Sequence, residues 1–110
     1  MNYKQGDIIK VALGSTIGHE QKGYRPVLII QNNLLSEAIE STTVVLPIST
    51  SNTLLPFEIE LPKSLKTKGK ILCRQVRAIN LNSRDTKYVE TVSNEILDQA
   101  IFYVSKIIGK

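Results

Sequence analysis

The sequence predicts a mainly β domain that ends in one helix. Its 110 residues supply enough chain for one hydrophobic core and too little for two. The chain holds 14 Ile and 8 Val against 4 Ala, and β-branched residues favour strands whereas alanine favours helices. Only the last part of the chain has apolar residues at helical spacing. Strands followed by one helix predict a small curled β-barrel packed by a C-terminal helix.

Five strands are predicted from short apolar runs that end at turn-forming residues. They cover residues 7–13, 27–30, 42–48, 57–61 and 70–79. The run 27–30 is uninterrupted, which is typical of a buried strand, whereas 57–61 alternates and indicates a half-exposed one. Pro47 lies near the end of the third strand, where a missing N–H is tolerated.

The segments between these strands differ in character. Residues 14–24 read as a long polar loop with three glycines, and loops of this length in a small domain are often functional. A short helix is predicted over 34–39, a hydroxyl-rich loop over 49–53 and a basic connection over 62–69.

The C-terminal helix is predicted from an apolar stripe bounded by capping residues. Ser93 or Asn94 supplies the N-cap, and Gly109 ends the helix. The stripe consists of Ile96, Leu97, Ala100, Ile101, Val104, Ile107 and Ile108. One helix cannot cover every face of a small barrel, so a homodimer is expected to bury the remainder.

Positive charge is concentrated in one segment. The whole chain has a net charge of +4, and residues 1–55 sum to zero. Residues 62–87 carry eight Lys and Arg against Asp85 alone, a local charge of +7. Clustered cations bind phosphates and also attract acidic proteins; a solvated rim is the alternative. Only six aromatic residues are present, without Trp, which argues against a platform of stacked rings for nucleic acid.

Several classes of protein are excluded by residue counts. One cysteine, Cys73, and one histidine, His19, rule out a disulfide scaffold and a cysteine-based zinc cluster, so neither a metal nor a cofactor is expected. Cys73 is expected to be a buried apolar residue. No apolar run approaches the roughly 18 residues of a membrane span, and residues 1–7 lack the apolar stretch of a signal peptide. A cytoplasmic protein is expected.

Segments spread along the chain resemble the MazF/PemK family of toxins. The resemblance begins with the sequence GDII at residues 6–9 and continues with GHEQKGYRPVLII at residues 18–30. Further matching segments lie at 45–50, 56–59 and 75–79. The resemblance therefore covers nearly the whole chain.

The resemblance implies one toxin domain over residues 1–110 with an SH3-like barrel, a fold that the family shares with the gyrase poison CcdB. Members are typically homodimeric, ribosome-independent endoribonucleases of type II toxin–antitoxin pairs. They cut single-stranded mRNA at short sequences without a metal. A flexible acidic tail of the antitoxin blocks the RNA groove, and the complex with the antitoxin is expected to bind DNA.

Four residues receive catalytic roles from the resemblance. Arg25 matches the family's catalytic arginine, and Ser49 falls where the family usually has a threonine, with Thr50 as a substitute if the loop is shifted by one. Metal-free cleavage uses the 2′-hydroxyl of RNA as nucleophile and needs a base, an acid and a cation for the phosphorane oxygens. The guanidinium of Arg25 suits the last task. His19 is a candidate for proton transfer and Glu20 a candidate base. The structural alternatives are a loop tie for Arg25, a turn hydroxyl for Ser49, an exposed side chain for His19 and a salt bridge for Glu20.

A second group of residues is expected to bind RNA through phosphates and base edges. It comprises Gln21, Lys22, Arg74, Gln75 and Arg77. Arg74 is also a departure, because the PemK branch has an acidic base at this position and an arginine acid two residues earlier, where Leu72 stands here. Either the chemistry rests on the first loop and Ser49, or activity is weakened. The alternative function is a non-catalytic barrel, either a CcdB-like gyrase poison or a degenerate binder of RNA or antitoxin.

Overall fold

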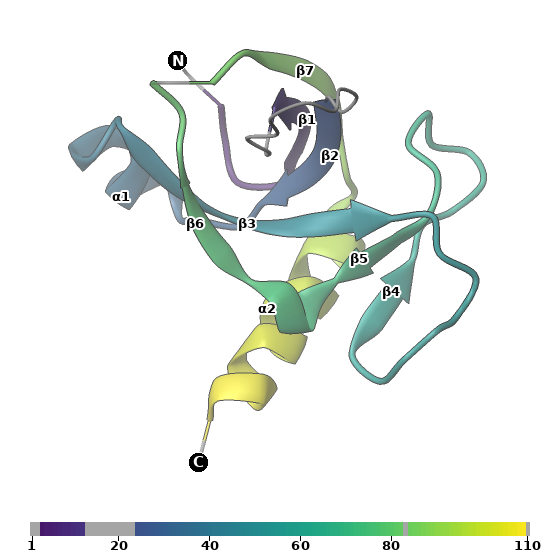
Figure 1. Ribbon diagram of the computed structural model, residues 1–110. Coiled ribbons are helices and arrows are strands. Elements are labelled where there is room, and N and C mark those ends of the chain that lie inside the picture. Colours follow the sequence, from purple (N-terminus) through teal and green to yellow (C-terminus); the bar gives the residue numbers. More distant parts are fainter. Residues whose placement is uncertain (1–2, 13–23, 83, 110) are drawn as a thin grey trace, which may run out of the picture.

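The computed structural model describes residues 3–12, 24–82 and 84–109. Figure 1 shows a curled sheet with one long helix on its outside. The elements are β1 (Asp7–Ala12), β2 (Tyr24–Ile29), α1 (Asn33–Ala38), β3 (Thr42–Ser49), β4 (Glu58–Glu60), β5 (Lys70–Leu72), the 3-10 turn η1 (Cys73–Gln75), β6 (Arg77–Asn80), β7 (Thr86–Thr91) and α2 (Asn94–Ile108). The predicted fold class, mainly β with a C-terminal helix, is confirmed.

The sheet is antiparallel and curls because β3, which pairs with β2 along one edge, takes part in two further ladders along the other. The strand order is β4-β5-β3-β2-β1-β7, and β6 pairs with β3 off this path. The first half of β3 pairs with β6, with Val45 opposite Arg77, whereas its end pairs with β5, with Ile48 opposite Ile71. β1, β2, β3, β6 and β7 thereby surround a barrel-like ring (Figure 1).

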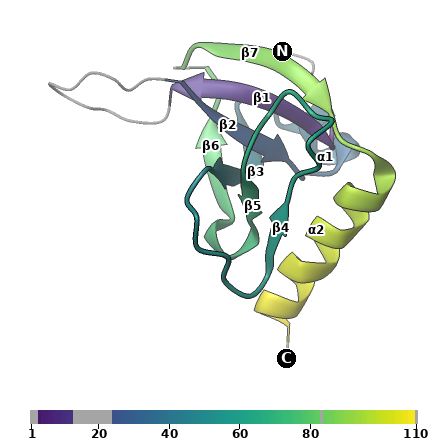
Figure 2. The same cartoon turned by 90° about the vertical axis from the view of Figure 1, so that its right-hand side faces the viewer.

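Because successive side chains of a strand point to opposite faces, the sheet has an apolar core on each of its two faces. The core inside the ring contains Ile9, Val11, Val27, Ile29, Val45, Ile79 and Leu81. The core on the outer face contains Ile8, Leu28, Leu46, Ile71 and Ala100, and α2 covers it (Figure 2). Successive residues of β1 and β2 thus enter different cores, which explains why 27–30 is apolar without interruption.

α2 forms as its caps and apolar stripe predict. The hydroxyl of Ser93 accepts a hydrogen bond from the Ile96 amide, so Ser93 is the N-cap. Gly109 is the C-cap, as predicted. No helix in the described part of the chain is long and apolar enough to cross a membrane.

Two sequence predictions about strands are wrong. The expected strand over 70–79 is divided, because the 3-10 turn η1 carries the chain from the β5 ladder to the β6 ladder of β3. The turn also buries Cys73 fully, and this burial raises the pKa of its thiol to about 11, so Cys73 is the expected apolar residue. The second error is an omission: β7 was not predicted, although it pairs with β1 along most of its length.

Candidate active site

Arg25 lies near the start of β2, on the face that lines the ring. It is the register partner of Val11, whose side chain is buried in the inner core, and paired residues of an antiparallel ladder share a face. The side chain of Arg25 itself is exposed. Arg25 therefore lies on the same face as the inner core, but beyond its apolar part, where its charge is exposed to water at the mouth of the ring.

Ser49 reaches the same end of the sheet from β3. The β2–β3 ladder ends with Val27 opposite Pro47. Two residues further along each strand, and on the same face, come Arg25 and Ser49. The hydroxyl of Ser49 accepts a hydrogen bond from the Ser51 amide at 3.1 Å, as a turn hydroxyl does, and its proton remains available for donation. Thr50, the alternative to Ser49, is exposed.

The conformation of Gly69 fixes how closely β5 approaches Ser49. Gly69 has a φ of +117°, which side chains rarely adopt, and a Cβ added there would overlap the Ser49 carbonyl oxygen. The backbone at the end of β3 is thus held by a position that only glycine can occupy.

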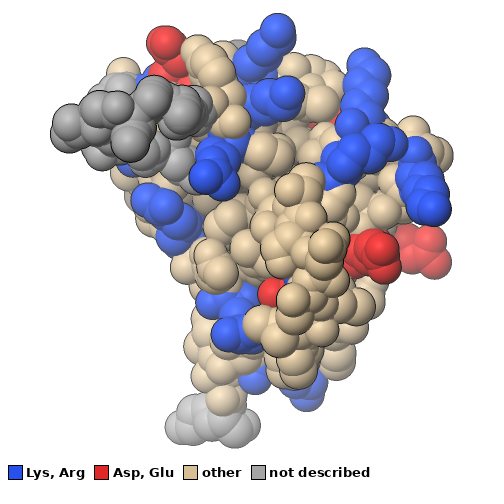
Figure 3. Space-filling model, turned by 45° about the vertical axis from the view of Figure 1, so that its right-hand side comes forward, with Lys and Arg blue, Asp and Glu red and all other residues tan. Residues whose placement is uncertain are grey.

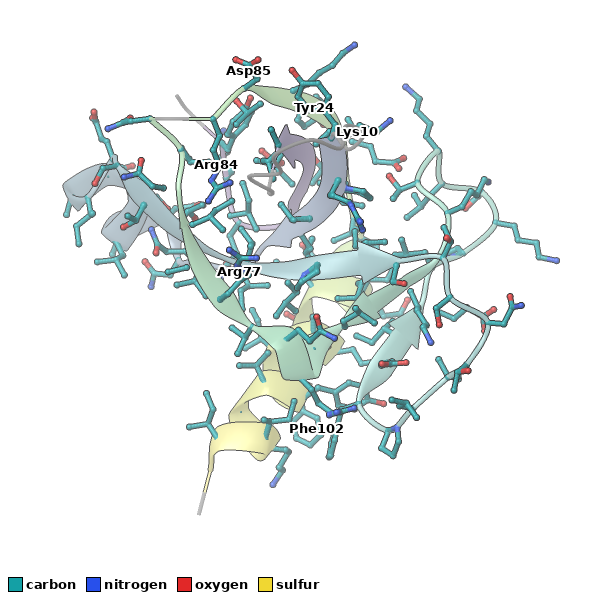
Figure 4. The ribbon with its side chains drawn as sticks, in the orientation of Figure 1. Lys10, Tyr24, Arg77, Arg84, Asp85 and Phe102 are labelled. Carbon is teal, nitrogen blue, oxygen red and sulfur yellow. The ribbon has the colours of Figure 1, made fainter. Side chains whose placement is uncertain are left out.

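Three of the predicted RNA-binding residues lie on η1 and β6. Arg74, Gln75 and Arg77 are all exposed. Arg77 is opposite Val45 and so shares the inner face with Arg25, and Figure 4 shows it on β6 beside β3. Arg74 and Gln75 extend this exposed surface from the turn between β5 and β6.

Glu58 is an acidic group near this surface that sequence reasoning did not single out. Its carboxylate is 2.9 Å from the ammonium of Lys70, and both side chains are less than a tenth exposed. The Leu55 amide and Lys70 lower the pKa of Glu58, with a smaller contribution from Arg74. The Glu58 carboxylate is thus already engaged by the Lys70 ammonium and the Leu55 amide.

A turn after β6 ties together the two strands that carry Arg25 and its neighbours. The guanidinium of Arg84 donates to the Ala12 carbonyl at 2.6 Å, and Figure 4 shows its side chain directed into the ring. The Asp85 carboxylate accepts a hydrogen bond from the Tyr24 hydroxyl at 3.2 Å. Desolvation and the adjacent Asp85 raise the pKa of Tyr24, so this phenol stays neutral. These contacts fix the end of β1 and the start of β2.

Four predicted site residues lie outside the described part of the chain. They are the catalytic candidates His19 and Glu20 and the RNA-binding candidates Gln21 and Lys22. Their roles stay predictions. Within the described residues, no group of three or more His, Cys, Asp or Glu side chains is placed to hold a metal ion.

A comparison with protein families identifies the chain. Residues 4–106 match the model of the PemK-like, MazF-like toxins of type II toxin–antitoxin systems. The chain belongs to this family. The match includes Arg25, Ser49, Arg74, Gln75 and Arg77.

Individual members of the toxin family are similar along most of their length. The chain is 30% identical to the endoribonuclease PemK of Escherichia coli over 109 residues, which cover 96% of this chain and 81% of PemK. It is 30% identical to the endoribonuclease EndoA of Bacillus subtilis over 104 residues, covering 90% and 88% of the two chains. A MazE-MazF crystal structure from Deinococcus radiodurans has a chain with a TM-score of 0.88 at 18% identity, covering 99% and 98%.

The basic segment of this toxin is less positive at its surface than the sequence suggests. Lys70 is one of its eight cations, but the ion pair with Glu58 neutralises it in the interior. Arg84 is directed into the ring rather than outward (Figure 4). Lys and Arg side chains are spread over several parts of the surface in Figure 3.

Proposed function

We propose that the chain is the toxin of a type II toxin–antitoxin pair and a metal-independent endoribonuclease that cuts single-stranded mRNA at specific sequences. The observation that carries this proposal is the family match over residues 4–106, together with an exposed Arg25 and a half-buried Ser49 that leave β2 and β3 on the same face. Two similar proteins are endoribonucleases by name. The protein is proposed to act in the cytoplasm, where mRNA is found.

The proposed reaction starts from the 2′-hydroxyl of the substrate. This oxygen attacks the adjacent phosphorus and displaces the 5′-oxygen of the next nucleotide, leaving a 2′,3′-cyclic phosphate. Arg25 supplies two parallel N–H donors and a fixed positive charge to the crowded phosphorane oxygens. Ser49 donates a further hydrogen bond to a phosphate oxygen. His19 and Glu20 remain the candidates for proton transfer.

The proposal predicts cleavage in the absence of divalent metal. Purified protein incubated with a long single-stranded RNA in EDTA is expected to cut it, and mapping of the new 5′ ends is expected to show a short common sequence. The 5′ fragment should end in a 2′,3′-cyclic phosphate or a 3′-phosphate, and the 3′ fragment should begin with a 5′-hydroxyl. A strict requirement for magnesium would contradict the mechanism. A folded protein that leaves RNA intact but inhibits gyrase would support the non-catalytic alternative.

The partner proposed for this toxin is an acidic antitoxin that competes with RNA. Solved structures of similar fold include MazE-MazF complexes. A flexible acidic tail is attracted by the same cations as RNA, so the two ligands are expected to exclude each other and to bind less tightly as salt rises.

A homodimer is proposed to form through an exposed apolar face between α2 and the segment before β4. Phe102 on α2 is 54% exposed, and Leu54 and Leu55 are also exposed. Phe57 contacts Tyr103 edge-on, with ring centroids 5.1 Å apart, which places this segment beside α2. Phe57 also has a φ of +62°, a strained conformation for an aromatic residue. Four large apolar side chains from two segments give a face that water covers poorly.

Phe102→Glu is expected to convert the dimer into a monomer, because it places a charge in the centre of the proposed apolar interface. Light scattering coupled to size-exclusion chromatography at several protein concentrations measures the change. Leu34→Glu is the matched variant, since Leu34 is 76% exposed on α1, on a different part of the surface (Figure 1). If Leu34→Glu dissociates the dimer and Phe102→Glu does not, the interface lies at α1 instead.

A further inference from the structure

A groove of about 860 Å³ lies on the outer face of the sheet, beside the catalytic candidates. The ends of β1, β2 and β7 line one side of it, and the connection between β4 and β5 lines the other. Four lysines face this groove: Lys10, Lys66, Lys68 and Lys87. Figure 3 shows Lys and Arg side chains on both sides of a neutral strip in this region. We call this feature the lysine groove.

Two of the lysines repel each other across a ladder. Lys10 of β1 and Lys87 of β7 are direct register partners, so their side chains leave the same face of the sheet a few ångströms apart. Like charges placed directly opposite each other destabilise a sheet. Within the described residues neither lysine forms an ion pair, and the other neighbour opposite Lys10 is the uncharged Pro26. An anion bound between the two ammonium groups would remove this repulsion.

The other two lysines are carried by a connection that β7 holds in place. The Glu90 carboxylate accepts hydrogen bonds from the Lys66 amide at 3.1 Å, the Thr67 amide at 2.8 Å and the Thr67 hydroxyl at 2.7 Å. Desolvation raises the pKa of Glu90, but these hydrogen bonds outweigh it and the net pKa is lowered. The carboxylate therefore stays charged and anchors the connection at neutral pH. Lys66 is held across the groove from Lys10 and Lys87.

The Lys68 ammonium is oriented by two backbone carbonyls. It donates hydrogen bonds to the carbonyls of Lys63 at 3.0 Å and Leu65 at 2.8 Å. Both partners are neutral, so they orient the ammonium without cancelling its charge. The lysine groove thus presents cations from both sides at defined positions.

The lysine groove begins where the catalytic face ends. Tyr24 and Thr50 line it, and they are the sequence neighbours of Arg25 and Ser49. Successive residues of a strand point to opposite faces. Arg25 and Ser49 therefore lie on the inner face, whereas the residues next to them, Tyr24 and Thr50, line the groove. In Figure 4 Lys10 and Tyr24 lie together at the end of the β1–β2 pair. A polymer that passes over the ends of β2 and β3 at Arg25 and Ser49 enters the groove directly.

Two of the chain's few aromatic residues also line the lysine groove. Tyr24 is 53% exposed and Tyr88 is 51% exposed. Hydrogen bonds hold both hydroxyls, that of Tyr24 to Asp85 and that of Tyr88 to Thr91 at 2.8 Å. Tyr24 is opposite Ala12 and so shares the face of Lys10, whereas Tyr88 is opposite Ile9 of the inner core. Tyr24 therefore offers a fixed ring beside the cations, as in sites that bind single-stranded nucleic acid, where bases stack on rings and lysines meet phosphates.

We propose that the lysine groove binds the backbone of the single-stranded RNA next to the cleaved bond, as a site separate from the catalytic residues; this rests on the proposed endoribonuclease function. An acidic peptide is the less favoured occupant. The four lysines act as point charges that can meet phosphates in any orientation. The ring of Tyr24 beside them gives a nucleobase a stacking surface that an acidic side chain does not need, and this favours RNA.

The experiment compares short and long RNAs centred on a mapped cleavage site. Binding is measured with a 2′-deoxy nucleotide at the cut position, so that affinity is read without cleavage. Lys10→Gln/Lys87→Gln is expected to weaken binding of the long RNA about tenfold and to reduce the slope of log affinity against log salt by about 1.4, since each phosphate contact on a single strand contributes about 0.7. Affinity for the short RNA and the rate at which the unmodified short RNA is cut should stay at parental values.

The melting temperature is a second measurement, and it distinguishes a lysine that binds RNA from one that stabilises the fold. Because Lys10 and Lys87 repel each other, Lys87→Gln is expected to raise the melting temperature by about 1–5 °C while it weakens binding of the long RNA. Lys4→Gln, which removes the same charge from an exposed side chain outside the groove, should change neither quantity.

Three results would overturn the proposal. The first is an equal loss of affinity for short and long RNA, and the second is a loss as large in Lys4→Gln. The third is unchanged RNA binding with weakened binding of an acidic peptide such as oligoglutamate, which would make the groove a peptide site. Failure of the parental protein to cut either RNA would refute the proposed function instead, and the affinities for the 2′-deoxy RNAs would still decide whether the groove binds RNA.

Discussion

Arg25→Ala is expected to lower the rate of RNA cleavage by roughly 100-fold or more, the loss seen when one preorganised donor to a transition-state oxyanion is removed. The side chain of Arg25 is exposed at the mouth of the ring, and its register partner Val11 keeps the inner core intact without it. The substitution should therefore leave the melting temperature near the parental value. Single-turnover rates on an RNA that contains the mapped site measure the effect, with melting curves recorded beside them.

Arg25→Lys separates charge from geometry. Lysine keeps the positive charge but loses the planar pair of N–H donors, so it should restore cleavage only in part. Arg77→Ala is the comparison within the same face, because Arg77 is an exposed arginine expected to bind RNA rather than to stabilise the phosphorane. It should raise KM more than it lowers kcat. If folded Arg25→Ala cuts RNA at the parental rate, the catalytic assignment is wrong.

The elements that the sequence predicted correctly are those set by local signals. The C-terminal helix has its apolar stripe, its Ser93 cap and its Gly109 end within one stretch of chain. The buried strand of residues 27–30 is evident because β2 contributes side chains to cores on both faces. Arg25 and Ser49 were found through the family resemblance, and only the strand register shows that they leave the sheet on the same face.

The elements that the sequence did not predict depend on contacts between distant residues. β7 has the composition of a polar segment and becomes a strand by pairing with β1, about eighty positions away. The strand predicted over 70–79 is interrupted because β3 offers two separate ladders, and no local pattern records where the chain must change from one to the other. A local break in alternation at Cys73-Arg74-Gln75 was the only available signal.

The charges show the same dependence on distant contacts. The sequence places a local +7 in residues 62–87, yet Glu58 neutralises Lys70 from a neighbouring strand and Glu90 anchors the amides of Lys66 and Thr67. The repulsive pair of Lys10 and Lys87 is invisible in the sequence, because 77 positions separate them and only the β1–β7 register brings them together.

Gly69→Ala is expected to be the most damaging single substitution outside the catalytic candidates. The φ of +117° at Gly69 is strained for alanine, and the added Cβ would overlap the carbonyl oxygen of Ser49, which belongs to the backbone and cannot rotate away. Strained backbone costs about 1–3 kcal/mol and overpacking a further 1–3 kcal/mol or so. The free energy of unfolding should therefore fall by about 3 kcal/mol or more, and the melting temperature by about 10 °C or more.

Gly6→Ala is the control that separates strain from overlap. Gly6 also has a positive φ, +97°, but its added Cβ would meet only Leu97 and Thr91 side-chain carbons, at 3.5 Å and 3.8 Å, which are ordinary contacts. In Gly6→Ala the free energy of unfolding should fall by about the cost of the backbone strain alone. Because the overlap in Gly69→Ala pushes on the Ser49 carbonyl, cleavage by the fraction that remains folded should also be slower than in Gly6→Ala at a temperature where both are folded. Equal stabilities and equal cleavage rates in the two variants would show that Gly69 does not hold Ser49 in place.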